Sequence, residues 1–436
     1  FYNLTGGTLS HAGGATSDAR FRIGNATGTN YGLVYVSGGT AGYSSGNGTL
    51  DLGSSATFAA GANAVGVISV SQSGTFSAST QNLKIANNSG TGQTAGGQSH
   101  VGQLTVGGAG STAATASFAD VTLAGSNAFS PGAGYVNLLS GGSLTAGSFS
   151  TNSYGTGYLN FNGGTLVVGA ASKTLAASMT GVFAHAGGAT INTNNLAYTI
   201  AAPISTPVGY GVSSVAISAG GSNYAGAPAV IISGGSGAGA TAIATVSGGQ
   251  VTGIVITSPG SGYASGDTLT VTLLGGGASS AATVGTISLG ANVSGGLTKT
   301  GAGTLTLSGA NTYTGATLVS AGTLTTSGNG RLQNNASGYT ISSGATLSIG
   351  GAETLDTLTN NGTVNIGGTL TTGANSFTMT GTTSGAGVLN KAGSGTLTLS
   401  AAGTFGHTGG TTVAGGSLAF AAANQLGGPL SISAGT

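Results

Sequence analysis

The chain of 436 residues contains no cysteine, no tryptophan and few charged side chains, with seven Lys or Arg and six Asp or Glu. The missing cysteines exclude a disulfide framework and any site in which thiolates hold a metal. A formal net charge of +1 is too small to neutralise a phosphate backbone, which excludes a nucleic-acid-binding surface. No run of 18 apolar residues occurs, so the sequence contains no candidate transmembrane helix.

Glycine is abundant instead, with 89 residues, and it flanks short stretches in which polar and apolar residues alternate. Thr304–Leu307 and Thr396–Leu399 are two such stretches, and a period of two predicts half-buried β-strands. We expect Leu305 to point into a core and Thr304 to point outward. Glycine pairs between the stretches predict turns, because glycine accepts positive φ. The composition and the pattern therefore indicate an all-β protein.

A strand-opening element, Gly-(Thr/Ser)-(Leu/Val/Phe), recurs along the chain. Copies begin at Gly7, Gly48, Gly74, Gly142, Gly164, Gly303, Gly322, Gly362, Gly368, Gly395 and Gly416. The nearest spacings include 22 residues from Gly142 to Gly164, 19 from Gly303 to Gly322 and 21 from Gly395 to Gly416, and a period of about 20 is typical of the coils of a solenoid. A single coil cannot bury its leucine, so coils stack and bury a continuous apolar column. The repeats therefore predict a β-solenoid with outward rows of threonine.

A longer repeat begins at Gly296 and reads G-L-T-K-x-G-x-G-T-L-T-L-S-G-x-N-T-Y-T-G. A second copy begins at Val388, with Lys391 where the first has Lys299, and is weakened by extra residues at Gly406 and His407. This run closely resembles the autotransporter-associated β-strand repeat of bacterial surface proteins. The resemblance implies a right-handed parallel β-helix that is displayed outside the cell as part of a large passenger region.

Residues 209–286 follow a different pattern, in which Val- and Ile-rich strands are followed by Gly221–Tyr224 and again by Gly260–Tyr263. Such a duplicated pattern predicts a small antiparallel β domain made of two repeats. It is similar to the G-S-G-Y repeats of bacterial surface and phage structural proteins. The expected organisation is therefore solenoid coils over 1–208, the inserted domain, and coils with the autotransporter-associated repeats over 287–436.

Insertions in solenoids project from one face, which makes the inserted domain a candidate binding module. Its tyrosines Tyr210, Tyr224 and Tyr263 are the candidate ligand-facing residues, because aromatic rings stack on sugars as readily as on one another. The ligand expected for them is a cell-surface or matrix glycan.

The residues that carry chemistry are too scattered to predict catalysis. The acids are Asp18, Asp51, Asp120, Asp267, Glu353 and Asp356, and the histidines are His11, His100, His185 and His407. Acid–base catalysis and metal binding both need convergent groups, so we expect no enzyme, no metal and no cofactor. Glu353 and Asp356 are predicted to lie in a solvated loop, and Lys299 and Lys391 to be structural or to blunt a strand edge. With so few titratable groups, stability is expected to vary little between about pH 5 and 9.

Both ends of the sequence resemble interior coils. The residues Phe1, Tyr2, Asn3 and Leu4 match part of the coil that begins at Tyr158, and the sequence closes with Leu430, Ile432 and Thr436. These seven residues are the predicted stacking ends, because open strand edges pair with further strands. The partner is then either more of a longer chain of the same kind or a second copy stacked head to tail.

The leading functional hypothesis is a structural, extracellular β-solenoid of the bacterial cell surface that forms part of a fibre or filament. The alternative is an adhesin, or glycan-binding passenger module, that uses residues 209–286. Outward Thr rows that bind ice or another crystal surface, and an enzyme, are the remaining alternatives. None of these readings requires a nucleic-acid partner or a membrane span.

Overall fold

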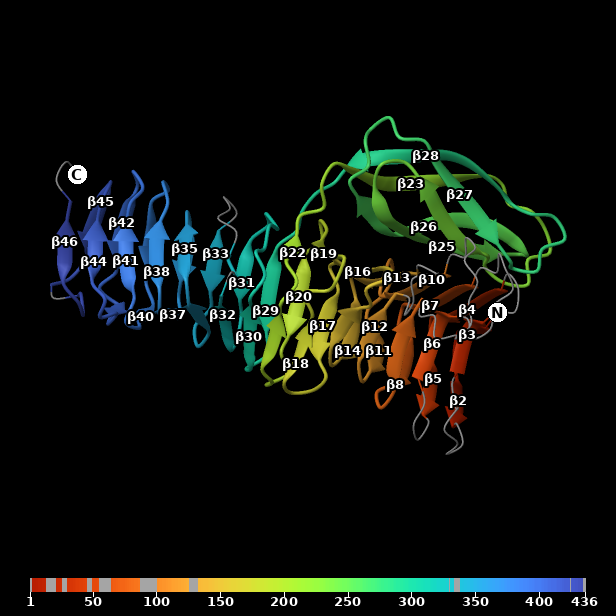
Figure 1. Cartoon of the computed structure of the whole chain (residues 1–436), viewed down its shortest axis with the longest axis horizontal. Helices are drawn as coiled ribbons and strands as arrows, with labels where there is room; N and C mark the ends of the chain where they lie inside the picture. Colours follow the sequence, from red (N-terminus) through yellow and green to blue (C-terminus); the bar gives the residue numbers. More distant parts are fainter. Residues whose placement is uncertain are drawn as a thin grey trace. The chain divides into compact units, whose positions relative to one another are not determined.

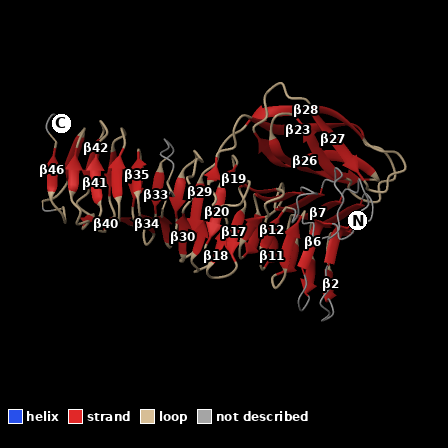
Figure 2. Ribbon diagram, in the orientation of Figure 1, coloured by secondary structure: helices blue, strands red, loops and turns tan. Residues whose placement is uncertain are grey.

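The computed structural model consists of β-strands, turns and loops, with no helix in the part of the chain that it describes (Figure 1; Figure 2). Within this part, no helix is long and apolar enough to cross a membrane. The chain divides into two compact units: unit 1 contains 1–169, 178–187 and 207–293, and unit 2 contains 170–177, 188–206 and 294–436. The described residues are 2–12, 21–25, 30–44, 49–54, 64–86, 100–124, 132–328, 330–332, 338–423 and 425–433.

Unit 1 contains three parallel ladders, and strands that follow one another in the chain lie in different ladders. Leu144, for example, lies beside Leu166 of the next coil. Ladder 1 consists of β1 (Tyr2–Leu4), β4 (Asn30–Val36), β7 (Ala64–Val70), β10 (His100–Val106), β13 (Gly132–Leu139), β16 (Thr156–Asn162) and β19 (Gly181–Ala184). Ladder 2 consists of β2 (Thr8–Ala12), β5 (Thr40–Ser44), β8 (Thr75–Ala78), β11 (Ala114–Phe118), β14 (Gly142–Ala146) and β17 (Thr165–Val168). Ladder 3 consists of β3 (Phe21–Asn25), β6 (Thr49–Ser54), β9 (Asn82–Ile85), β12 (Val121–Leu123) and β15 (Phe149–Thr151).

Unit 2 is built in the same way, which confirms the predicted parallel β-solenoid. Ladder 4 consists of β20 (Ala189–Asn192), β29 (Leu297–Thr300), β31 (Thr317–Val319), β33 (Tyr339–Ile341), β36 (Leu358–Asn360), β39 (Phe377–Met379), β42 (Thr396–Leu399) and β45 (Ser417–Phe420). Ladder 5 consists of β18 (Lys173–Leu175), β21 (Tyr198–Ile200), β30 (Thr304–Leu307), β32 (Thr323–Thr326), β34 (Thr346–Ile349), β37 (Thr363–Ile366), β40 (Thr382–Ser384) and β43 (Thr404–Phe405). Ladder 6 consists of β35 (Ala352–Leu355), β38 (Thr369–Thr372), β41 (Val388–Lys391), β44 (Thr411–Val413) and β46 (Leu430–Ile432), and β22 is Ile204–Ser205.

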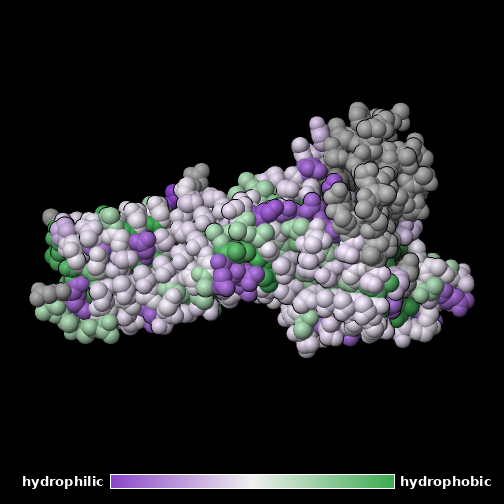
Figure 3. All heavy atoms as spheres, turned by 90° about the horizontal axis from the view of Figure 1, so that it is seen from below, coloured by the Kyte–Doolittle hydropathy of each residue, from purple (hydrophilic) through white to green (hydrophobic). Residues whose placement is uncertain are grey.

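Alternation along each short strand places leucine inside and threonine outside. Leu305 pairs with Leu324, which pairs with Leu347, and all three are fully buried. The outward neighbours form a row in register, made of Thr304, Thr323, Thr346, Thr363, Thr382 and Thr404. This confirms the inward and outward assignment made from the sequence. The face shown in Figure 3 is mostly of intermediate hydropathy, with scattered hydrophilic and hydrophobic patches.

Glycine opens the strands because successive coils come into close contact at these positions. Gly322 has a φ of +65°, and a Cβ there would lie 2.5 Å from the carbonyl oxygens of Gly301 and Gly303. A side chain at Gly322 would therefore force two coils apart, which explains the glycine of the strand-opening element.

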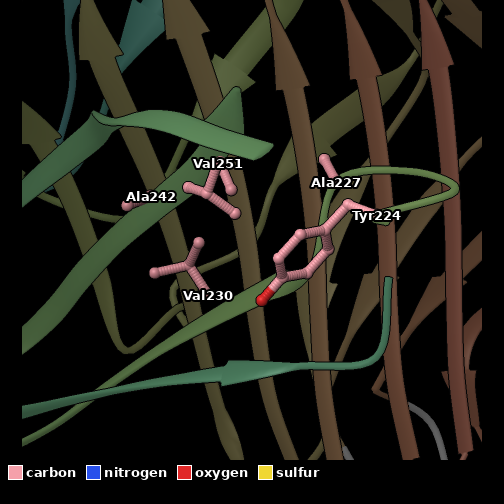
Figure 4. Close-up of a cluster of buried hydrophobic side chains, with 6 residues drawn as sticks. Tyr224, Ala227, Val230, Ala242 and Val251 are labelled. Atoms are coloured by element: carbon pink, nitrogen blue, oxygen red, sulfur yellow. The ribbon is translucent and has the colours of Figure 1, made fainter. Parts of the chain in front are cut away.

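The inserted domain is antiparallel throughout. β23 (Tyr210–Ala219) pairs with β28 (Thr283–Ala291), and a four-stranded sheet has the order β26 (Gln250–Ser261), β25 (Ala238–Ser247), β24 (Ala229–Gly234), β27 (Leu269–Leu274). One apolar cluster of the domain surrounds Tyr224 (Figure 4), and a second surrounds Tyr263. The domain starts and ends at neighbouring points, because the Asn292 N–H donates to the Gly209 carbonyl at 2.9 Å.

The structure corrects the expected C-terminal boundary of this domain. Residues 287–291 were assigned to the returning coil, yet they belong to β28, where Ile287 lies opposite Val215 of β23. The first coil strand after the domain is β29, and the compact unit that contains the domain extends to Val293. The error arose because a period of two looks the same in antiparallel and parallel strands.

Candidate functional site

The inserted domain packs on the outer face of ladder 1 in unit 1 (Figure 1). Leu33, Val65 and Val67 are 3–4% exposed and form an apolar cluster with Ala229 of β24. Every residue of β7 is buried, as expected for a strand that is covered on both faces. The domain is therefore fixed along the coils rather than projecting freely from them.

A buried polar network joins the domain to the same ladder. Its members are Gln103, Thr105, Asn137 and Asn160 of ladder 1 and Thr241 and Thr257 of the domain. Gln103 Nε2 donates to Thr105 Oγ1 at 2.9 Å and to Thr257 Oγ1 at 3.0 Å. Asn137 Nδ2 donates to Thr241 Oγ1 at 3.0 Å, and its Oδ1 accepts from Asn160 Nδ2 at 2.9 Å. A buried amide without hydrogen-bond partners destabilises the folded state. This network therefore favours the one position of the domain on the coils in which these groups are paired.

The three tyrosines predicted to face a ligand lie in different environments. Tyr224 and Tyr263 are 7% and 4% exposed, and each belongs to one of the two cores of the domain. Burial is incompatible with a ligand-facing role for these two residues, and the repeated Gly-Ser-x-Tyr pattern marks the core tyrosine of each repeat instead. Tyr210, at 36% exposure, stays a candidate.

Two pockets lie along the seam between the domain and the coils of unit 1. The smaller, of about 160 Å³, is lined by Asn162, His185, Ser213 and Asn292 among others. His185 ends a row of ring contacts through Phe183 and Tyr158, and its Nε2 is buried without a hydrogen-bond partner. Burial lowers the pKa of His185 to about 4, so the ring is neutral above that pH. The larger pocket, of about 490 Å³, is lined by Tyr35 and by small polar and apolar residues.

Two of the acids, Asp120 and Asp267, accept hydrogen bonds from segments that are about 30 residues away in the chain. Asp120 Oδ1 accepts from Ser148 N and Oγ at 2.7 Å, and Asp267 Oδ2 accepts from Ser236 and Ala264. Three or more potential metal ligands do not gather anywhere among the described residues. Asp18, one of the acids of the sequence, lies outside the described residues.

The predicted stacking ends are described only in part, because Phe1 and Thr436 lie outside the described residues. Tyr2 and Asn3 of β1 are exposed and Leu4 is half-buried. Leu430 and Ile432 of β46 are 45% and 66% exposed. Two of these side chains continue buried positions, because Tyr2 lies beside Val34, which is 8% exposed, and Ile432 lies beside Val413, which is 6% exposed.

Lys299 and Lys391 are fully buried, so they do not blunt a strand edge. Lys299 Nζ donates to the carbonyls of Thr300 at 2.9 Å, Gly301 at 2.6 Å and Ala321 at 2.9 Å. Lys391 Nζ donates in the same way to the carbonyls of Gly393 and Gly415, the latter at 3.0 Å. Each lysine thus joins the turn of its own coil to the turn of the next, which is a structural role. Burial lowers the pKa of Lys299 to about 8.

The two lysine-centred coils match a known family model. Residues 297–325 and 389–420 each match the passenger-associated-transport-repeat. The chain carries passenger-associated transport repeats. This finding confirms the resemblance to autotransporter-associated repeats that the sequence indicated.

A comparison with curated proteins found no match. A solved structure titled "Crystal structure of TibC-catalyzed hyper-glycosylated TibA55-350 fragment" is 12% identical, with 98% of this chain and 99% of that chain covered. The TM-score of 0.23 shows that the folds superpose poorly, so this likeness carries no argument.

The second transport repeat keeps its geometry despite its divergent sequence. In the first repeat the buried Tyr313 OH bonds Thr317 Oγ1 at 2.7 Å. In the second, His407 Nε2 bonds Thr411 Oγ1 at 2.9 Å, and His407 Nδ1 bonds Thr383 Oγ1 at 2.9 Å. His407 therefore occupies the place of the motif tyrosine and is not one of two extra residues. The spacing in the sequence did not reveal that His407 is equivalent to Tyr313, because the inserted residues lie a few positions before His407.

Glu353 lies between the two transport repeats and is buried, which contradicts the predicted solvated loop. It belongs to β35, and its carboxylate accepts from the Leu332 N–H at 3.0 Å. Burial raises the pKa of Glu353 to about 7, while the Leu332 hydrogen bond and the charge of Arg331 act in the opposite direction. Asp356 is a separate group whose Oδ1 accepts from the Ala374 N–H at 3.2 Å, so the two acids do not form a catalytic pair.

The raised pKa of Glu353 predicts that the free energy of unfolding depends on pH. The native state holds this proton more tightly than the unfolded chain, so its stabilising contribution is complete below pH 4.5 and is lost as the pH rises through about 7. We expect the unfolding free energy of unit 2 to fall across this range by about 3 kcal/mol more in the wild type than in Glu353→Gln. Urea unfolding at a series of pH values measures both slopes. Parallel profiles for the two proteins would contradict the assignment and restore the pH-insensitive behaviour expected from composition.

Proposed function

We propose that this chain is a structural segment of a bacterial passenger, a β-solenoid displayed at the cell surface or secreted. The observation that supports it is the pair of transport repeats, whose buried lysines join turns of successive coils. Leucine columns, backbone ladders and Lys–carbonyl bonds hold coils together through contacts with neighbouring coils. Such a fold needs no cysteine or cofactor, and its threonine-rich exterior with few charges suits an extended scaffold.

A surface-display experiment tests this proposal. The chain is inserted between a signal peptide and the outer-membrane translocator domain of a bacterial autotransporter, and intact cells are labelled with antibody and then treated with protease. We expect labelling of the chain, loss of labelling after protease, and an intact periplasmic marker. A chain that is expressed and folded but stays inaccessible while the translocator reaches the outer membrane would contradict the proposal.

We further propose that β1 and β46 pair with further coils, either from more of the same chain or from a second copy stacked head to tail. The exposed Leu430 and Ile432 support this, because the preceding strand of the same ladder buries Thr411 and Val413 at the equivalent positions. A second copy would make a contact that does not close on itself and would grow as a filament.

Ile432→Asp is expected to reduce self-association without lowering the melting temperature, because Ile432 is already 66% exposed. Ser431→Asp, a change on an exposed neighbour, serves as the matched control because Ser431 alternates with the column positions. Sedimentation velocity over a concentration series and the axial repeat in electron micrographs measure assembly. A wild-type chain that stays monomeric at the highest concentrations, or equal effects of the two variants, would count against stacking by a second copy.

The second candidate function is adhesion through glycan binding on the inserted domain. The observation that favours it is the larger pocket at the seam, which is uncharged and combines an aromatic residue with hydroxyl and amide groups. Tyr210 is the exposed tyrosine of the predicted ligand-facing set, but it does not line this pocket.

A further inference from the structure

One polar row runs along the outer face of ladder 1 and changes environment along its length. Asn3, Tyr35 and Ser69 lie side by side in register, and the row continues through Thr105 and Asn137. Thr105 and Asn137 are fully buried, because the hydroxyls of the inserted domain close over them. At Asn3, Tyr35 and Ser69 the row instead opens into the pocket of about 490 Å³. The row is thus sealed at Thr105 and Asn137 and borders the pocket at the half-buried Tyr35, the buried Ser69 and the exposed Asn3.

The walls of this pocket come from two parts of unit 1. The coils contribute Asn3, Tyr35, Ser37, Ser69, Ser71 and Gln72, and the inserted domain contributes 225–227 and 243–246. Serine hydroxyls and the Asn and Gln amides supply both donors and acceptors. Among these lining residues none carries a charge, so the pocket offers no counterion to an anion and no carboxylate to a metal.

The wall from the inserted domain is small and fixed. Ala225, Gly226, Ala227 and Ala244 leave the space open, and the Gly276 carbonyl accepts from both Ala225 N at 2.9 Å and Gly226 N at 3.2 Å. A wall that is held by backbone hydrogen bonds needs little ordering when a ligand binds, which favours affinity.

We propose that this pocket binds a neutral carbohydrate. The inference rests on the second candidate function and deepens it by naming the site and the ligand class. A sugar presents many hydroxyls that both donate and accept, together with a C–H face suited to an aromatic ring such as Tyr35. The volume lies within the range of about 300–1,000 Å³ that is typical of small-molecule sites. A strongly apolar ligand would leave the serine and amide groups without partners, and an anionic one would find no positive charge.

The test uses the full chain on an array of neutral oligosaccharides that end in glucose, galactose, mannose or N-acetylhexosamine, with their sialylated and sulfated counterparts. We expect binding to one or more neutral oligosaccharides, confirmed by titration calorimetry with the free sugar. Ala225→Trp is expected to raise the dissociation constant at least about tenfold, because the indole, attached at an exposed position, fills the pocket. Ala264→Trp, an exposed alanine of the same domain outside the pocket, is expected to leave the affinity unchanged.

The affinity of Tyr35→Ala for the sugar measures the contribution of the aromatic ring. The affinity of Gln72→Ala is a second measurement, at an exposed lining residue whose substitution does not depend on the packing of Tyr35. Binding only to sialylated or sulfated sugars, binding to no neutral sugar, or equal affinities for Ala225→Trp and wild type would each overturn the proposal. Surface display is measured independently, so failure of sugar binding is distinguishable from failure of the structural function.

Discussion

Replacing Leu305 by Asp is expected to unfold the coils of unit 2 that carry the transport repeats. Leu305 is fully buried and lies between Tyr198 and Leu324 in ladder 5. A carboxylate at this position would lie in an apolar column without a partner for its charge. We expect a loss of at least about 4 kcal/mol, which is a large fraction of the stability of a typical domain.

Thr304→Asp is the matched control, because Thr304 is adjacent in sequence and points outward from the same strand. Its carboxylate stays hydrated, so the expected loss is below about 1 kcal/mol. Urea unfolding of both variants, followed by far-ultraviolet circular dichroism, measures the difference. Equal destabilisation would show that the column and the threonine row are wrongly assigned.

Deleting residues 207–293 is expected to destabilise and aggregate the coils of unit 1, although the deletion joins points that lie close together. The polypeptide can be rejoined because Gly209 and Asn292 are hydrogen-bonded neighbours. The damage arises on ladder 1, where Leu33, Val65 and Val67 lose the cover of the domain. At about 1.5–3 kcal/mol for each buried side chain, the loss is on the order of 5 kcal/mol.

A second deletion variant that also carries Leu33→Thr, Val65→Thr and Val67→Thr is expected to recover a soluble, monodisperse solenoid. Threonine suits an exposed strand and removes the apolar patch that the deletion creates. Light scattering and thermal melting compare the two deletion variants with the full chain. If the simple deletion melts and scatters like the full chain, the domain does not stabilise the coils.

The sequence predicted the repeating part of the fold well because coil structure is local. Thr304–Leu307 shows by alternation which residue is buried, and Gly322 is required by the close contact between coils. The lysine-containing run was recognisable as a transport repeat for the same reason. The roles of single polar residues were harder to predict. The sequence predicts a structural or edge-blunting role for Lys299, a solvated loop for Glu353 and an extra residue of the second repeat for His407, yet all three are buried.

The sequence did not reveal the burial of these residues, because burial of a charged or polar group depends on partners from other coils. Lys299 is satisfied by the Ala321 carbonyl, and Glu353 by the Leu332 N–H. Such partners are backbone groups and leave no signature in the sequence. A clue to the covered face did exist in Ala64–Val70, whose outward positions Val65 and Val67 are apolar, whereas the outward positions of Thr304–Leu307 are threonine.

The sequence by itself thus determined the β-solenoid class, the alternation of leucine and threonine, the transport repeats and the presence of an antiparallel insertion. Each follows from periodicity, from turn-forming glycine or from a motif contained in one coil. Only the tertiary structure decided where the insertion packs, which tyrosines are buried and where the uncharged pocket lies beside Tyr35. These features arise from contacts between residues more than a hundred positions apart, such as Asn137 and Thr241, and side-chain packing rather than local pattern selects them.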